Sequence, residues 1–116
     1  MSDHLKKCPA VFFRTDAGGE PVREWLQGPK KDDRTRIGTD VKTAEYGWPI
    51  GMPLCRPMGA GLWEVRTNLD ENRIARVLFC VLDEQLVLLH GFIKKTAKTP
   101  DDDLKLARKR MKEVKR

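Results

Sequence analysis

The chain has 116 residues, of which 40% are hydrophobic and 34% are charged, and its formal net charge is +6 at pH 7. This length predicts one domain spanning residues 1–116 with a modest buried core. The composition excludes a disordered chain, and no apolar run approaches the roughly 18 residues of a membrane span. Residues 1–10 are polar and lack the apolar centre of a signal peptide, so we expect a cytoplasmic protein without a membrane partner.

The sequence contains no pattern typical of a metal or cofactor site. Its three cysteines, Cys8, Cys55 and Cys80, lie far apart and form no CxxC pair or Cys/His ligand spacing. Neither a disulfide framework nor a zinc site is therefore expected. The glycine-rich nucleotide motifs and the GxSxG motif are also missing, so we expect no cofactor and no Ser/His/Asp hydrolysis.

The positive charge is concentrated at the C-terminal end. Residues 1–93 contain 13 Lys/Arg and 13 Asp/Glu, whereas residues 94–116 contain 10 Lys/Arg and 4 Asp/Glu. A basic end on a neutral body indicates a polyanionic partner such as RNA, or an acidic protein. The alternative is a solvated helix face, because Lys and Arg also keep protein surfaces soluble, and charge alone does not decide between the two.

The first half of the chain predicts one strand, two helices and a loop. The β-branched and aromatic residues 10–13 predict a strand. Apolar residues spaced three and four apart predict helices over 20–26 and over 30–45, the first with a proline in its first turn. Residues 47–61 contain four glycines and three prolines, which predicts a long irregular loop of the kind that is often functional.

The second half predicts a β-meander followed by a basic helix. Residues 62–66, 74–82 and 85–93 read as antiparallel strands, with Asp83 and Glu84 as a tight turn. In the last helix Thr99 is a suitable N-cap, and the acidic triplet that follows favours the positive helix end. The predicted order is β-α-α-β-β-β-α, an α+β fold in which helices pack on a curved antiparallel sheet.

Charged residues on the predicted strands point to a phosphate site. With that turn, the expected register is Leu82 opposite Gln85, Phe79 opposite Leu88 and Arg76 opposite Gly91. Arg76 then shares the more open face of its strand with Leu78, Cys80 and Leu82, while Val77, Phe79 and Val81 face the core.

An antiparallel return places Arg66 within a residue or two of Arg76, and Lys94 or Lys95 beside them. Such cations suit a phosphodiester and the charge of its transition state, and Gly91 would leave room for a nucleotide. Alternatively, Arg66 pairs with Glu64 or Asp70 in a surface salt bridge.

Three segments resemble the RelE/ParE superfamily of toxins, most closely its phage-derived HigB-like members. They are LWEVR at 62–66, IARVLFCVLDEQLVLLHGFIKKTAKTP at 74–100, and the helix that begins DDDLKLARKRM at 101. The resemblance covers about residues 60–112, with a fainter likeness over 10–47, and the stretch LHGF-x-KKT-x-KTP is its most specific part.

The resemblance implies a RelE-like fold and a type II toxin–antitoxin system toxin. Such a toxin is an endoribonuclease that cleaves mRNA without a metal, usually on the translating ribosome, and so inhibits translation. A cognate antitoxin, commonly a helix-turn-helix protein, neutralises it. In these enzymes the 2′-hydroxyl attacks the adjacent phosphate, leaving a cyclic phosphate, and basic residues stabilise the added charge.

Carried onto this sequence, the resemblance assigns Arg66 and Arg76 to the phosphate, and Lys94 and Lys95 to a catalytic or RNA-binding cation. The possible acid/base residues are His90, Glu64 and Asp101, and the expected RNA-binding residues of the basic end are Lys98, Arg108 and Lys109.

One departure from the superfamily pattern leaves alternatives open. Many relatives keep a tyrosine or histidine near the start of the last helix as acid or base, whereas here residues 99–103 read TPDDD. Asp101 or Asp102 could take that role, although helix capping also explains them. A non-catalytic RelE-fold module that binds a protein or RNA is one alternative function, and a ParE-like toxin that acts on DNA gyrase is another.

Overall fold

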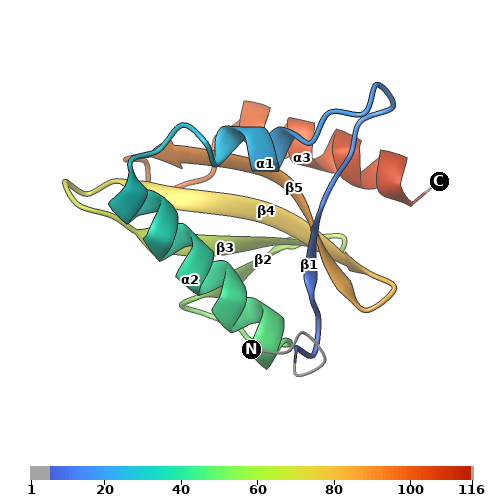
Figure 1. The fold of residues 1–116 in the computed structure, drawn as a ribbon, viewed down its shortest axis with the longest axis horizontal. Coiled ribbons are helices and arrows are strands. Elements are labelled where there is room, and N and C mark those ends of the chain that lie inside the picture. Colours follow the sequence, from blue (N-terminus) through green and yellow to red (C-terminus); the bar gives the residue numbers. More distant parts are fainter. Residues whose placement is uncertain (1–5, 116) are drawn as a thin grey trace.

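The computed structural model describes residues 6–115, so residues 1–5 of the polar start lie outside the described part. Figure 1 shows its elements. They are β1 (Ala10–Phe12), α1 (Pro21–Trp25), α2 (Lys31–Gly47), β2 (Cys55–Gly59), β3 (Leu62–Asn68), β4 (Ile74–Leu82), β5 (Gln85–Lys94) and α3 (Asp101–Val114). The α+β class is confirmed, and every predicted helix and strand is present.

The five strands form one mixed sheet in the order β1-β5-β4-β3-β2. The predicted antiparallel pairing of β3, β4 and β5 is confirmed. The prediction of a wholly antiparallel sheet is wrong, because β1 pairs with β5 in parallel, with Ala10 beside Leu86. This short strand covers the edge that β5 would otherwise leave unpaired.

The predicted loop over 47–61 contains a further strand, β2, so the predicted element order lacks one strand. β2 pairs antiparallel with β3, placing Arg56 opposite Glu64, and the register shifts between Pro57 and Gly59. Proline is tolerated there because β2 is the sheet edge, where its missing N–H costs no ladder bond. The prolines and glycines that predicted a loop instead mark an edge strand and its turn.

The turn between β4 and β5 has the predicted form. Asp83 and Glu84 both have positive φ, at 52° and 61°, as in the two-residue turns that join tightly twisted hairpins. The pairs Leu82–Gln85 and Phe79–Leu88 are confirmed, but a bulge between Leu78 and Phe79 shifts the rest of the register. Arg76 therefore lies opposite Phe92 rather than Gly91.

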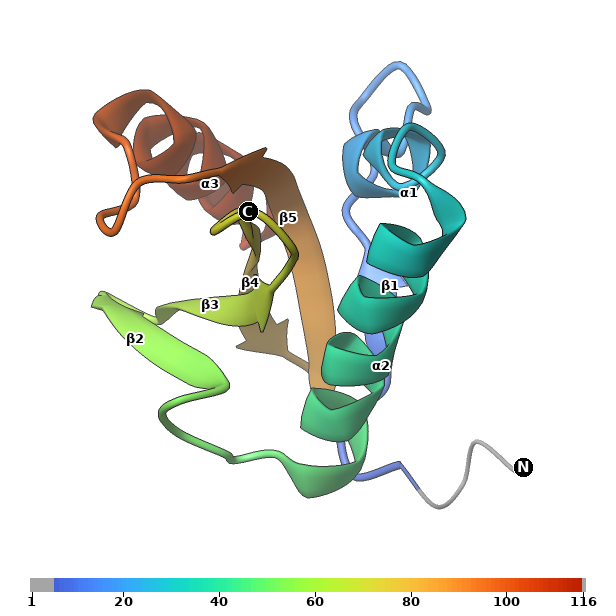
Figure 2. The ribbon, with the colours of Figure 1, turned by 90° about the vertical axis from the view of Figure 1, so that its left-hand side faces the viewer.

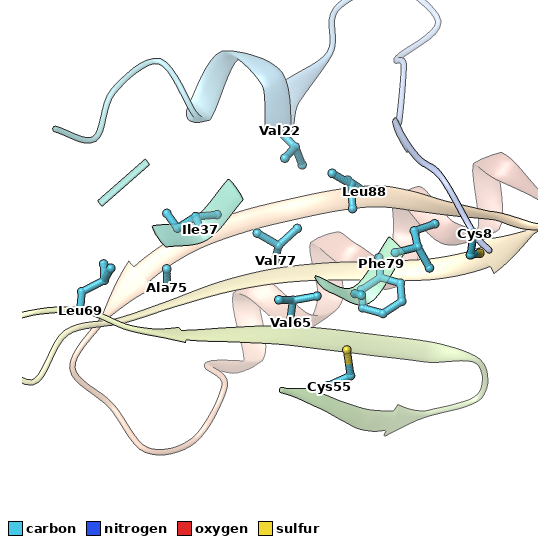
Figure 3. Packing of buried hydrophobic residues seen from close by; sticks show 12 residues of the cluster. Cys8, Val22, Ile37, Cys55, Val65, Leu69, Ala75, Val77, Phe79 and Leu88 are labelled. Atoms are coloured by element: carbon cyan, nitrogen blue, oxygen red, sulfur yellow. The ribbon is translucent and has the colours of Figure 1, made fainter. Parts of the chain in front are cut away.

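Helices cover both faces of the sheet, as Figure 2 shows: α1 and α2 lie on one side and α3 on the other. In Figure 3, Val22 of α1 and Ile37 of α2 point toward Val77 and Leu88 of the sheet. A second apolar cluster joins Leu78 and Leu89 to Ala107 and Met111 of α3. The prediction of an open face around Arg76 is therefore wrong, because α3 buries that face as well.

The start of the last helix also differs from its prediction. The helix begins at Asp101, its N-cap is Pro100, and no side chain caps it. Thr99 is buried, and its hydroxyl donates to Glu64 Oε2 at 2.5 Å instead of capping. The three aspartates do occupy the first turn, where the helix dipole favours negative charge.

None of the helices described between residues 6 and 115 is both long and apolar enough to cross a membrane.

Gly91 is required because an indole ring packs directly on it. A Cβ at this position would lie 2.5 Å from Cε3 and Cζ3 of Trp25. The space over Gly91 is therefore occupied by Trp25, which corrects the expectation that a nucleotide approaches there.

We expect Gly91→Ala to lower the free energy of unfolding by about 1–3 kcal/mol, measured by urea denaturation.

Gly38→Ala is the matched control, because Gly38 lies inside α2 and a Cβ added there would meet no other atom within 4 Å. Since alanine is the better helix former, Gly38→Ala should raise stability by about 0.5–1 kcal/mol. Equal stability of the Gly91→Ala variant and the unmodified protein would contradict the packing described here.

Candidate functional site

Three neighbouring strands place charged side chains on the sheet face that α3 covers. Arg66 of β3 pairs with Arg76 of β4, which confirms the predicted proximity of the two. One step along the strands, Glu64 pairs with Leu78, and Leu78 pairs with His90 of β5. Because residues paired across strands share a face, these side chains lie in adjacent rows.

Arg76 forms the buried centre of this group, with a side chain that is 0% exposed. Its Nη2 donates to the carbonyl oxygens of Thr96 and Ala97, at 2.6 and 3.1 Å, and its guanidinium lies 5.8 Å from the Phe92 ring centroid. Burial lowers the pKa of Arg76 against the opposing effect of Glu64. A buried guanidinium fixed by two carbonyls holds the segment after β5 against the sheet.

Glu64 lies between the two arginines, also with a fully buried side chain. Its Oε1 is 3.7 Å from Arg66 Nε and 3.7 Å from Arg76 Nε, and its Oε2 accepts the hydrogen bond from Thr99. Arg66 therefore pairs with Glu64, as one of the expected alternatives had it, but the carboxylate is buried rather than on the surface. Among the described residues, Glu64 Oε1 and Arg76 Nε and Nη1 have no hydrogen-bond partner.

Arg66 is the member of this pair of arginines that reaches solvent, with 22% of its side chain exposed. Arg56 of β2 adds a further cation, because it lies opposite Glu64 and contributes to lowering the pKa of Arg76. The predicted cation Lys94 lies at the end of β5, opposite Ile74.

His90, Lys94 and Asp103 form a second charged group beside the arginines. Asp103 Oδ1 lies 2.7 Å from His90 Nε2, and Asp103 Oδ2 accepts a hydrogen bond from Lys94 Nζ at 2.8 Å. Burial would raise the pKa of the Asp103 carboxyl, but the hydrogen bonds from His90 and Lys94 outweigh it and the pKa is lowered. Asp103 is therefore an ionised acceptor that joins the first turn of α3 to β5.

The tautomer of neutral His90 follows from this contact. An ionised carboxylate can only accept, so Nε2 must carry the proton that it donates to Asp103. Nδ1 is then left with its lone pair, and it can accept a proton from a substrate. The ring also stacks on Phe92, with centroids 5.7 Å apart, which further restricts its orientation.

Several predicted site residues lie apart from this cluster. Asp101, Lys95 and Lys98 are exposed. Arg108 donates to the carbonyl oxygens of Met58 and Gly59, so it fastens α3 to the β2–β3 turn. Lys109 lines a different surface hollow, near Phe13 and Arg110.

Arg56 and Asp103 are cluster members that the sequence did not single out. The glycines and prolines around Arg56 predict a loop, so the pattern gives no sign that Arg56 lies on a strand. The pattern also does not separate Asp103 from Asp101 and Asp102, because all three suit the positive end of the helix dipole. The position of Asp103 in the first turn of α3, on the side that carries Ala107 and Met111 toward the sheet, is the signal that distinguishes it.

Within residues 6–115, no group of three or more His, Cys, Asp or Glu side chains could hold a metal ion. The chemistry that the described residues can supply comes from Arg56, Arg66, Arg76 and Lys94 against the carboxylates of Glu64 and Asp103. Four cations and two carboxylates leave two positive charges beside a histidine that can accept a proton. This arrangement suits binding of a phosphodiester and removal of a proton from a neighbouring hydroxyl.

A family model described as phage derived protein Gp49-like (DUF891) matches residues 24–112. The matched range includes all six charged residues of the cluster, together with His90. No curated protein matches the chain.

The Asp103 contacts give stability a defined pH dependence. Because the pKa of Asp103 is lower in the folded protein, its ionised form stabilises the fold at neutral pH, and this contribution is lost as the pH falls through the folded pKa. We expect Asp103→Asn to cost about 1.5 kcal/mol of unfolding free energy at pH 7, with the cost shrinking below about pH 4.

Asp102→Asn is the control, since Asp102 lies in the same helical turn but is exposed. Chemical denaturation at pH 7 and at pH 3 compares the two variants. If Asp102→Asn lost as much stability as Asp103→Asn, the effect would belong to the helix dipole and not to the His90 and Lys94 contacts.

Proposed function

The chain belongs to the phage-derived Gp49-like family, a RelE/HigB-like toxin family associated with toxin–antitoxin systems, and on this basis we propose that it is a type II toxin that cleaves mRNA. The proposal includes a RelE-like fold and inhibition of translation on the ribosome. The single observation that carries the nuclease part is the cluster of Arg56, Arg66, Arg76 and Lys94 beside the His90–Asp103 pair.

In the proposed reaction Arg66 binds the scissile phosphate, because it is the partly exposed arginine of the buried ion-pair group. Arg76 has no exposed surface, so it does not contact the substrate. It positions Glu64 and the segment after β5, and it adds positive potential at the site. A guanidinium that is already positioned stabilises the charge of a pentacoordinate phosphorus without reorganising in the transition state.

His90 is the proposed general base. Its Nδ1 takes the proton of the 2′-hydroxyl, O2′ attacks the adjacent phosphorus, and the bond from phosphorus to the 5′-oxygen breaks. The products are a 2′,3′-cyclic phosphate and a 5′-hydroxyl. We assign the Lys94 ammonium as the acid that donates a proton to the leaving 5′-oxygen. Asp103 keeps the required tautomer and stabilises the imidazolium that forms, as the buried carboxylate does in Ser/His/Asp sites.

This assignment supplies a proton-transfer residue in place of the tyrosine or histidine that is missing at the start of the last helix, the departure that leaves a non-catalytic module as an alternative. Here α3 contributes Asp103 instead, and the ring that exchanges the proton comes from β5. A change of element for the base is compatible with the same chemistry, because geometry and not sequence position defines catalytic roles. The proposed partners are mRNA, the ribosome and a cognate helix-turn-helix antitoxin, in the cytoplasm.

Arg66→Ala tests the phosphate contact. Because the exposed guanidinium is lost while buried Arg76 still neutralises Glu64, we expect the variant to fold and to lose growth inhibition when expressed without an antitoxin. Cleavage of mRNA should fall by about 10²-fold or more. Arg14→Ala is the control, since the Arg14 side chain is 70% exposed and lies outside the cluster. Full toxicity of Arg66→Ala would remove Arg66 from the mechanism.

His90→Gln tests the general base. Glutamine preserves a polar side chain of similar length but accepts no proton, so the cleavage rate of purified protein should fall by about 10²–10⁴-fold. The cleavage rate of Asp103→Asn should fall less, and its pH dependence should shift. The base is still present in this variant, but the substitution alters its tautomer and charge. A His90→Gln variant that cleaves at the unmodified rate would exclude His90 as the base.

A further inference from the structure

A groove of about 490 Å³ lies at the edge of the sheet, between α2 and the end of β3, on the α2 side of the sheet. Its walls include Arg36, Thr39 and Asp40 of α2, Pro53 and Leu54 of the segment before β2, and Arg66 and Asn68 of β3. The Arg36 guanidinium is paired with Asp70. Arg66 belongs both to this groove and to the ion-pair group around Glu64. Pairing with β2 does not extend past Leu54 and Arg66, so the edge of β3 is open there, and a nucleotide whose phosphate contacts Arg66 can place an adjoining base around this edge in the groove.

The strand edge in this groove offers unpaired backbone groups. Arg66 donates its backbone N–H to Leu54 O, which is the last contact of β3 toward β2 before β3 runs on to Asn68. Leu69 donates its backbone N–H to Arg73 O, on the β4 side of the strand. Because backbone groups alternate in direction along a strand, the N–H and C=O of Asn68 point to the other side, where β2 has no residue to pair with them. One donor and one acceptor at a strand edge match the donor and acceptor pattern of a nucleobase edge.

The side chains of the groove restrict which base fits. Asp40 is half-buried and, among the described residues, has no hydrogen-bond or ion-pair partner. A carboxylate only accepts, so it favours bases that present an amino group and disfavours a base edge made mostly of carbonyl oxygens. Pro53 and Leu54 add an apolar surface against which the flat face of a base can lie.

We propose that the groove between α2 and β3 is a nucleobase-binding subsite, in which Asp40 and the free edge of β3 at Asn68 select an amino-bearing base next to the scissile phosphate. Adenine, guanine and cytosine can donate an amino group to Asp40, whereas uracil can donate only its N3–H, so uracil binds this subsite less well. This inference rests on the proposed function for its RNA substrate, and it adds a source of cleavage-site preference that is separate from the catalytic cluster.

The test combines mapped cleavage with binding of RNA that cannot be cut. On RNA of mixed sequence, the cuts of the unmodified protein should avoid uracil at one position beside the scissile phosphate. Asp40→Asn should reduce that discrimination by about tenfold, because the amide can donate to a uracil carbonyl. Asp32→Asn is the matched control, because Asp32 is an exposed aspartate in the first turn of α2 and does not line the groove.

Binding is followed by NMR with 2′-O-methyl trinucleotides, whose blocked 2′-oxygen prevents cleavage. Trinucleotides with adenine, guanine or cytosine should shift the amide signals of Thr39 and Asn68 and should bind more tightly than the uracil version. Asp40→Asn should reduce this difference in affinity. If the protein cuts RNA without such shifts or base preference, the groove proposal is overturned and the nuclease proposal stands. If the protein cuts no RNA, the nuclease proposal fails, and unshifted groove signals in the titration would also refute the subsite.

Discussion

The carboxylate of Glu64, buried in β3, accepts a hydrogen bond from Thr99 and faces the guanidinium groups of Arg66 and Arg76. A buried charge that loses its partner destabilises a protein by about 3–5 kcal/mol. None of these side chains can therefore move away from the others without a large loss of stability. They connect β3 and β4 to the segment that precedes α3. The same constraint leaves Arg66 oriented at the surface, where a phosphate can reach it.

The position of α3 is what turns a charged sheet face into a possible reaction site. Thr99 and the two carbonyls bound by Arg76 hold the start of this helix, and Asp103 then meets His90 and Lys94. A structural ion-pair group and a proton-transfer pair thus share one sheet face. Because Arg76 is buried, we propose that it organises the site, while Arg66, His90 and Lys94 retain exposed surface.

The sequence predicted the elements and the closeness of Arg66 and Arg76, because periodicity and a two-residue turn specify local structure and hairpin register. It did not predict β2, since the same prolines and glycines that suit a loop also suit an edge strand. It missed the bulge at Leu78, which no local pattern marks, and so misplaced Gly91. It assigned Thr99 to a helix cap because the partner that it actually binds, Glu64, is 35 residues away. Burial of both sheet faces and the selection of Asp103 among three aspartates likewise depend on how α3 docks.

The central claim is that this charged cluster cleaves RNA by internal attack of the 2′-hydroxyl. Inducible expression of the protein, followed by transcriptome-wide mapping of RNA ends that carry a 2′,3′-cyclic phosphate, tests it most directly. We expect new cyclic-phosphate ends within coding sequences soon after induction and before growth stops, and none when the antitoxin is co-expressed. Growth arrest with intact mRNA, above all with damaged DNA, would contradict the claim and favour a toxin that acts on gyrase.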